Sequence, residues 1–159
     1  AAFISGKTNV YAYLLLPTTV QKLEPVLTKL FQEHLPEKRH YLLLRQKTYP
    51  VKIYLEDIVY MELFNRKLKI WKWKEYIEVR AQIKDIERLL DHRFFRIHEG
   101  YLINLDFFVS IHKDKNSYDV TMENGIRLPM SRLKKNALLQ ALQEKAKRDP
   151  QGQLLYPRE

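Results

Sequence analysis

Apolar and polar positions alternate with a period of two along much of the middle of the chain, which is typical of strands with one buried face. These short runs are separated by polar, Pro-containing or Gly-containing turns. The predicted strands cover residues 41–45, 51–54, 58–64, 68–73, 76–79, 101–103, 107–111, 118–122 and 126–130. An amphipathic helix is predicted at 82–91, with Ile83, Ile86, Leu89 and Leu90 on its apolar side. The pattern therefore predicts a mainly β domain over residues 41–142.

Local signals mark two hairpins and the start of a last helix. Residues 65–67 (Asn-Arg-Lys) are typical of a turn. Asn124-Gly125 predicts a type I′ turn, because both central residues of that turn need a positive φ. Ser131 is predicted to cap the last helix, which would carry Leu133 on its apolar side.

The flanking segments differ from this middle part. Residues 1–40 contain a short apolar run at 11–16, then a helical pattern from Val20 to Phe31 that is interrupted by Pro25. Residues 143–159 are predicted to form a polar C-terminal tail. Because the chain starts at Ala1 rather than at Met, we expect a processed or engineered start, or a fragment.

The net charge of the chain limits the classes of partner that it can bind. The 159 residues hold 28 Lys and Arg against 19 Asp and Glu, a net charge of +9. This excess favours a polyanionic partner such as nucleic acid, although it also fits a merely soluble basic protein. The chain has no Cys and no apolar run long enough to span a membrane, so we expect a cytoplasmic protein without disulfides.

Catalytic and metal-binding patterns are missing from the sequence. None of the five His has metal-ligand spacing, no Ser lies in a G-x-S-x-G motif, and the four Gly do not form a phosphate-binding loop. We therefore expect no enzyme activity, no cofactor and no metal.

Two basic clusters are the best candidates for binding chemistry. Residues 66–74 contain five basic residues and no acid, on a predicted hairpin, with Arg66, Lys67 and Lys69 near its turn. They either grip phosphates or protect an edge strand against aggregation. Arg132, Lys134 and Lys135 begin the last helix, where free amides favour phosphate and an Arg can bind guanine through two hydrogen bonds. The alternative there is a solvated helix face.

A third segment places polar residues inside an apolar stretch, at residues 94–104. For Asn104 we favour a structural role, a buried side chain satisfied by backbone groups. For His98 a structural and a functional role stay equally open.

Together these segments resemble the LytTR-type DNA-binding domain of bacterial response regulators. The residues that carry the resemblance are 53–62, the signature F-x-R-x-H-x-x-Y-x-I-N at 94–104, and N-G followed by L-P-M-S-R at 124–132. The resemblance implies an elongated β-sandwich with one or two short helices, preceded here by the strand-helix segment. It also implies a transcriptional regulator of the two-component type that binds promoter direct repeats as a homodimer, with loops in the major groove of double-stranded DNA.

The resemblance also implies which residues read DNA. These are Arg132, the hairpin turn with Arg66, Lys67 and Lys69, and the residue after His98, which is Glu99 here. Many relatives carry a basic or amide residue at that last position. Glu99 either repels phosphate or accepts a hydrogen bond from cytosine.

Residues 1–40 resemble the last strand and helix of a receiver domain, which would link the protein to a sensor kinase. They are alternatively an unrelated dimerisation arm. The alternative function is a protein-interaction or dimerisation module with only nonspecific nucleic-acid binding. Single-stranded nucleic acid and a membrane surface rank below both.

Overall fold

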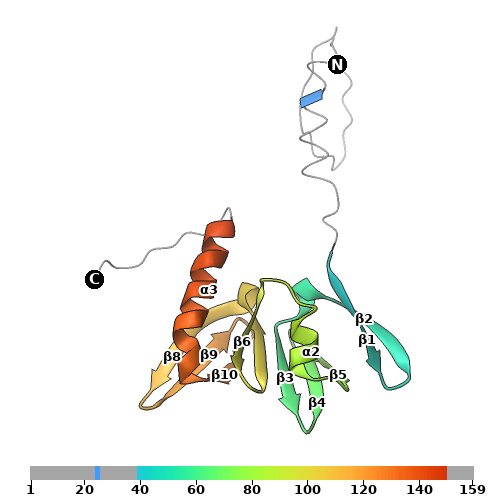
Figure 1. Ribbon diagram of the computed structural model, residues 1–159, viewed down its shortest axis with the longest axis horizontal. Helices are drawn as coiled ribbons and strands as arrows, with labels where there is room; N and C mark the ends of the chain where they lie inside the picture. Colours follow the sequence, from blue (N-terminus) through green and yellow to red (C-terminus); the bar gives the residue numbers. More distant parts are fainter. Residues whose placement is uncertain (1–23, 26–38, 150–159) are drawn as a thin grey trace, which may run out of the picture. The chain divides into compact units, whose positions relative to one another are not determined.

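The computed structural model describes residues 24–25 and 39–149. The chain divides into two units, Ala1–Lys38 and Arg39–Glu159. Glu24 and Pro25 are helical. The predicted strand at 11–16, most of the predicted helix from Val20, and the end of the predicted tail lie outside the described residues. The described part of the second unit is residues 39–149 (Figure 1).

The predicted mainly β fold is confirmed in this part of the chain. The strands are β1 (Tyr41–Gln46), β2 (Tyr49–Tyr54), β3 (Tyr60–Phe64), β4 (Lys67–Trp71), β5 (Tyr76–Val79), β6 (Phe94–His98), β7 (Tyr101–Asn104), β8 (Phe108–Asp114), β9 (Ser117–Met122) and β10 (Arg127–Met130). The helices are α2 (Ile83–Glu87), α3 (Lys135–Arg148) and the short 3-10 helices η1 (Leu55–Asp57), η2 (Leu105–Phe107) and η3 (Arg132–Lys134).

The strands form three antiparallel sheets. They are a hairpin β1-β2, a central sheet in the order β5-β4-β3-β7-β6, and a sheet in the order β10-β9-β8. Because β4 pairs with both β3 and β5, it is not an edge strand. The alternative in which its lysines protect a free edge is therefore wrong.

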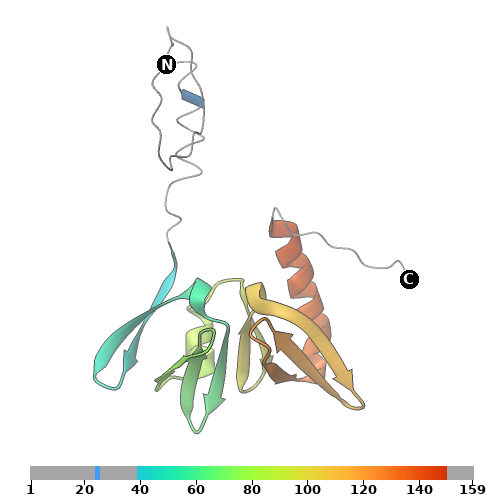
Figure 2. The ribbon, with the colours of Figure 1, turned by 180° about the vertical axis from the view of Figure 1, so that it is seen from behind.

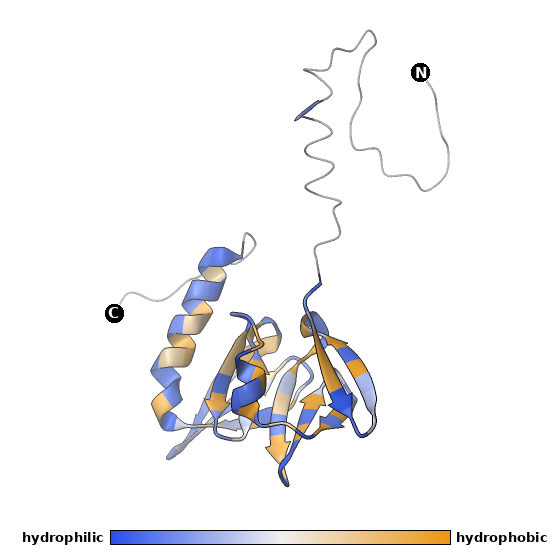
Figure 3. Ribbon diagram, turned by 45° about the vertical axis from the view of Figure 1, so that its right-hand side comes forward, coloured by the Kyte–Doolittle hydropathy of each residue, from blue (hydrophilic) through white to orange (hydrophobic). Residues whose placement is uncertain are grey.

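The central sheet is buried on both faces, which makes the fold a sandwich. Leu68 and Ile70 of β4 are fully buried on one face, against α2 and the β1-β2 hairpin. Tyr60 and Ile103 pack on the other face, against β8–β10 and α3. Figure 3 shows the resulting alternation of apolar and polar residues along the strands and around α3. This layering gives the turns between strands a rigid base.

Several local predictions were wrong in detail. Residues 94–98 form the strand β6, which the sequence did not predict, and a bulge between Arg96 and His98 breaks its alternation. Helix α2 ends at Glu87 instead of Asp91, so Leu89 is exposed instead of packed. Helix α3 continues to Arg148, six residues into the segment predicted as a tail.

The turn at Asn124-Gly125 and the helix start at Ser131 also differ. Only Gly125 has a positive φ, of 84°, and its amide donates to the Met122 carbonyl at 2.8 Å. The connection is therefore a type I turn that ends in a left-handed glycine, instead of a type I′ turn. The Ser131 side chain makes no capping hydrogen bond, and η3 separates it from α3. Leu133 lies in η3 and is 91% exposed.

Among the described residues, no helix combines the length and the apolar character needed to cross a membrane.

Candidate nucleic-acid interface

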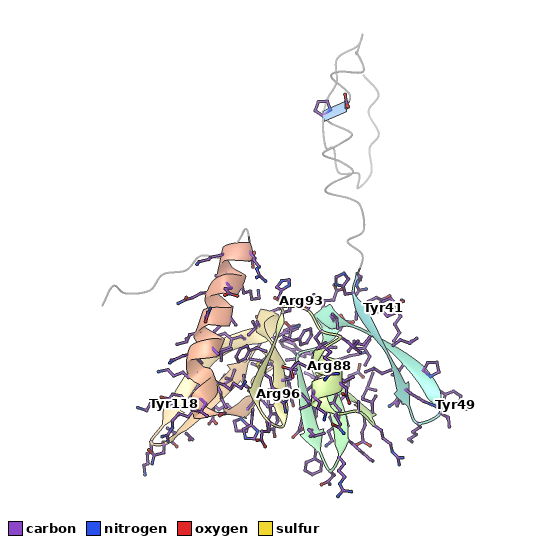
Figure 4. The ribbon with its side chains drawn as sticks, viewed as in Figure 1. Tyr41, Tyr49, Arg88, Arg93, Arg96 and Tyr118 are labelled. Carbon is purple, nitrogen blue, oxygen red and sulfur yellow. The ribbon has the colours of Figure 1, made fainter. Side chains whose placement is uncertain are left out.

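Four hairpin turns and η3 lie along one side of this unit, at the lower edge in Figures 1 and 2. The turns are residues 47–48, 65–66, 99–100 and 115–116. We call these turns and η3 the tip edge. Arg96 and Tyr118 lie toward this edge, whereas Arg93 and Tyr41 lie at the opposite one (Figure 4). The antiparallel topology thus brings together segments that are far apart in the sequence.

Hydrogen bonds connect neighbouring members of the tip edge. The Leu63 amide, at the end of β3, donates to the Gly100 carbonyl at 2.8 Å. The Ser131 amide donates to the carbonyl of the buried Ile97 at 2.9 Å, which fixes the start of η3 on β6. The side chains on this edge are therefore carried by backbone that the core holds in place.

The β3–β4 turn holds Arg66 in an unfavourable backbone conformation. Asn65 and Arg66 have φ values of 49° and 60°, the left-handed region that a type I′ turn requires. A residue with a side chain pays about 1–2 kcal/mol in this region, which is why glycine is usual there. An exposed cation occupies the tip in spite of this cost, and backbone strain of this kind is concentrated at functional sites.

The β6–β7 turn is braced by the side chains of its own signature. Arg96 donates to the carbonyl of His98 at 3.3 Å and to the carbonyl of Glu99 at 2.9 Å. The Gly100 amide donates to Nδ1 of His98 at 3.2 Å. The neutral imidazole then carries its proton on Nε2, which stays a donor. His98 therefore has a structural role in the turn, and Glu99 is left exposed.

The Tyr of the signature connects this turn to the central sheet. The Tyr101 hydroxyl donates to Glu62 at 3.1 Å, and the Trp71 indole lies 3.4 Å from the other oxygen of that carboxylate. Burial and the hydrogen bond with Glu62 raise the pKa of Tyr101. The Tyr101 hydroxyl therefore stays protonated at neutral pH and serves as a donor.

Asn104 has the structural role that the sequence favoured. Its side chain is fully buried. It donates to the Ile58 carbonyl at 2.8 Å and accepts from the Asp106 amide at 3.0 Å. The side chain therefore joins β7 to the connection before β3.

η3 presents three consecutive exposed side chains, Arg132, Leu133 and Lys134. Arg132 donates to the Asn116 carbonyl in the β8–β9 turn at 2.7 Å. A guanidinium has five N–H donors, so this bond orients the group and leaves donors for a ligand.

The remaining predicted lysines have partners within the domain. Lys67 forms an ion pair with Glu78 at 2.6 Å, and its hydrogen bond holds the pKa of that carboxyl below its usual range. The Lys69 ammonium lies 4.6 Å from the Phe64 ring centre, and the Lys135 ammonium lies 5.5 Å from the Tyr118 ring centre. These three cations thus have partners within the domain, whereas Arg66 and Lys134 have none among the described residues.

Comparison with known proteins identifies the fold. The family model described as the LytTr DNA-binding domain matches residues 48–143, which is more than half of the chain. The chain belongs to the LytTR family. A search of solved structures finds the LytTr DNA-binding domain of a Bacillus cereus protein described as a methyl-accepting/DNA response regulator, with a TM-score of 0.57 and 18% identity over 67% of this chain and 98% of that one. This likeness shows the fold. A search of curated proteins finds no match.

Sequence reasoning missed several cations at or near the tip edge. Arg45 and Lys47 belong to the β1-β2 hairpin, and Arg80 directly follows β5. No cluster in the sequence marked them, because they lie in separate segments. In the structure, Lys47 is distinguished by its φ of 53°, which is left-handed like that of Arg66.

The described part of the LytTR domain contains no group of three His, Cys, Asp or Glu residues that could hold a metal ion.

Proposed function

We propose that this chain is a sequence-specific DNA-binding transcriptional regulator of the two-component response-regulator type. It would bind paired direct repeats in promoters as a homodimer, with the tip edge facing the major groove. The tip edge carries the proposal, because it gathers cations from distant segments on backbone fixed to the core. A sensor kinase that acts through a receiver domain stays a prediction.

Phosphate contacts would come first from the cations that lack a partner in the described part of the chain. Arg66 and Lys134 are exposed and form no ion pair there. Lys67, Lys69 and Lys135 would contribute less, because each must first leave a carboxylate or a ring. Contacts of this kind position the protein on DNA and carry no sequence information.

Base reading would fall to Arg132, Glu99 and His98. The guanidinium fork of Arg132 matches the two acceptors of guanine in the major groove. The exposed carboxylate of Glu99 accepts a hydrogen bond from the amino group of cytosine. Nε2 of His98 is a donor at the same turn. The neighbouring positions of these residues on η3 and on the β6–β7 turn suit a short stretch of base pairs.

The first experiment is the selection of bound duplexes from a random pool at about 0.15 M salt, where nonspecific binding is weak. A recovered direct repeat supports a dimeric promoter reader and supplies its operator. Absence of enrichment, together with concentration-dependent self-association, would instead favour the protein-interaction module.

The role of Arg132 is then tested by Arg132→Ala. We expect a loss of about 1–3 kcal/mol that is confined to one base position of the operator. Lys147→Ala, on the distal end of α3, is the matched control and should leave affinity unchanged. An equal loss on every sequence would make Arg132 a phosphate contact instead of a base reader.

A further inference from the structure

Two cavities that are both lined by Arg80 lie beside the tip edge, one near the β1–β2 turn and one near the β3–β4 turn. The first, of about 550 Å³, lies among Arg45, Lys47, Lys67, Glu78 and Arg80. The second, of about 660 Å³, lies between the β3–β4 turn and the start of α2, and is also lined by Arg80. We call the two together the β5 groove. Arg80 lines both cavities, which extend toward the β1–β2 turn and the β3–β4 turn respectively.

The groove is strongly basic. Seven basic side chains and only two acidic ones line it. One of the acids, Glu78, is neutralised by Lys67 at 2.6 Å. Among the described residues, no carboxylate forms an ion pair with Arg45, Lys47 or Arg80. These like charges repel one another in the free domain, and an anion that enters the groove relieves the repulsion.

Backbone geometry supports a binding role independently of charge. Lys47 has a φ of 53° and Arg66 a φ of 60°, so a cation occupies a left-handed position at both ends of the groove. Each conformation is disfavoured by about 1–2 kcal/mol for a residue with a Cβ. Glycine or asparagine would fit each turn with less strain but would not supply a charge there.

We propose that the β5 groove binds the phosphodiester backbone of DNA beside the base pairs read by Arg132 and Glu99. The inference rests on the proposed function and extends the protein–DNA contact across the β1-β2 hairpin. The fork geometry of Arg45 and Arg80 suits two oxygens of one phosphate, and Lys47 adds a point charge. Because these side chains only donate hydrogen bonds, they match the acceptors of the backbone and supply affinity without sequence preference.

The test is the salt dependence of DNA binding by the triple variant Arg45→Ala, Lys47→Ala, Arg80→Ala. Each lost phosphate contact lowers the slope of log K against log salt by about 0.9, so we expect a decrease of about 2–3. The matched control removes three cations at the opposite edge, Lys74→Ala, Lys147→Ala and Arg148→Ala. It has the same net charge and should keep the wild-type slope. Thermal unfolding of both variants checks that each of them is folded.

A hydroxyl-radical footprint on the selected operator locates the contact. Wild-type protein should protect backbone on one flank of each half-site, and the triple variant should expose that flank while the base-read positions stay protected. A second variant, Arg45→Lys with Arg80→Lys, should restore most of the slope. A triple variant that loses no more slope than the control, or that leaves the footprint unchanged, would overturn the inference.

Failure of the proposed function gives a different result. If selection recovers no operator, the same slopes are measured on an arbitrary duplex. A lower slope for the triple variant then still supports a phosphate-binding groove, although the protein reads no sequence. Equal slopes for the triple variant and the control on that duplex would reject the groove.

Discussion

Replacing Asn104 should destabilise the domain by an amount that the structure allows us to work out. Its side chain is fully buried and bonds the Ile58 carbonyl at 2.8 Å and the Asp106 amide at 3.0 Å. Asn104→Ala leaves the buried carbonyl without a partner, at a cost of about 1–3 kcal/mol. Loss of the bond to Asp106 removes the cap of η2, at about 0.5–2 kcal/mol. The total is roughly 1.5–5 kcal/mol, against about 5–15 kcal/mol for a whole domain.

Urea unfolding measures this loss directly. A drop of about 2 kcal/mol or more also lowers Tm by at least about 8 °C in a domain of this size. Asn136→Ala is the matched control, because Asn136 is exposed on α3. Its effect should lie within about 0.5 kcal/mol of zero.

Asn104→Asp separates hydrogen bonding from side-chain volume. The introduced carboxylate still accepts from the Asp106 amide, but it faces the Ile58 carbonyl with no proton to donate. Burial raises the pKa of such a carboxyl above its unfolded value of about 3.9, so the folded state takes up a proton on acidification. The penalty relative to wild type should therefore be largest near pH 8 and should shrink toward about pH 5.

Two outcomes would refute this account of Asn104. A loss below about 0.5 kcal/mol for Asn104→Ala would mean that water replaces both bonds. A penalty for Asn104→Asp that does not change with pH would mean that the defect is steric and that donation to Ile58 is unimportant.

Two further predictions concern charged pairs. Glu78→Gln should release Lys67 for contact with DNA, which raises the affinity and increases the salt slope by up to about 0.9. Binding titrations across a salt series measure this slope. An unchanged slope would show that Lys67 does not reach DNA. For Asp91, burial acts to raise the pKa, but the hydrogen bonds from Arg93 outweigh it and hold the pKa below its usual range. The ion pair of Asp91 with Arg93 therefore stabilises the fold at neutral pH, and this stabilisation is lost on acidification below about pH 4. The unfolding free energies of wild type and Asp91→Asn should converge there. A difference that persists in acid would contradict this account.

The sequence predicted the parts of the fold that depend on local alternation. The hairpin with its turn at Asn65-Arg66 was predicted and is confirmed, as is the strand Tyr76–Val79. Strand β6 was missed because its apolar residues are contiguous and its bulge between Arg96 and His98 interrupts the period of two. Helix α2 was predicted too long because its apolar spacing continues to Leu89, where the chain already turns toward β6.

The tip edge as a surface could not be predicted in the same way. Arg132 and Arg66 were candidates because each lies in a local cluster of cations. Arg45 and Lys47 lie in the β1-β2 hairpin and Arg80 follows β5, and only the packing of β1 beside β5 brings them into one groove. The partners of Lys67 and Lys69 could not be predicted from the sequence either. The partner of Lys67 depends on the register between β4 and β5, and the partner of Lys69 depends on which aromatic rings lie nearby.

The signature that identifies the family mainly fixes the fold, and this limits what it says about the DNA target. Arg96 and His98 bond the backbone of their own turn, Tyr101 bonds Glu62, and Asn104 bonds a buried carbonyl. Glu99 lies between these residues with its side chain exposed. The residues of the motif therefore position the turn, and under the proposed function Glu99 at its tip would contact the DNA. Domains with the same signature should consequently share this fold and differ in operator wherever the exposed residue at this turn differs.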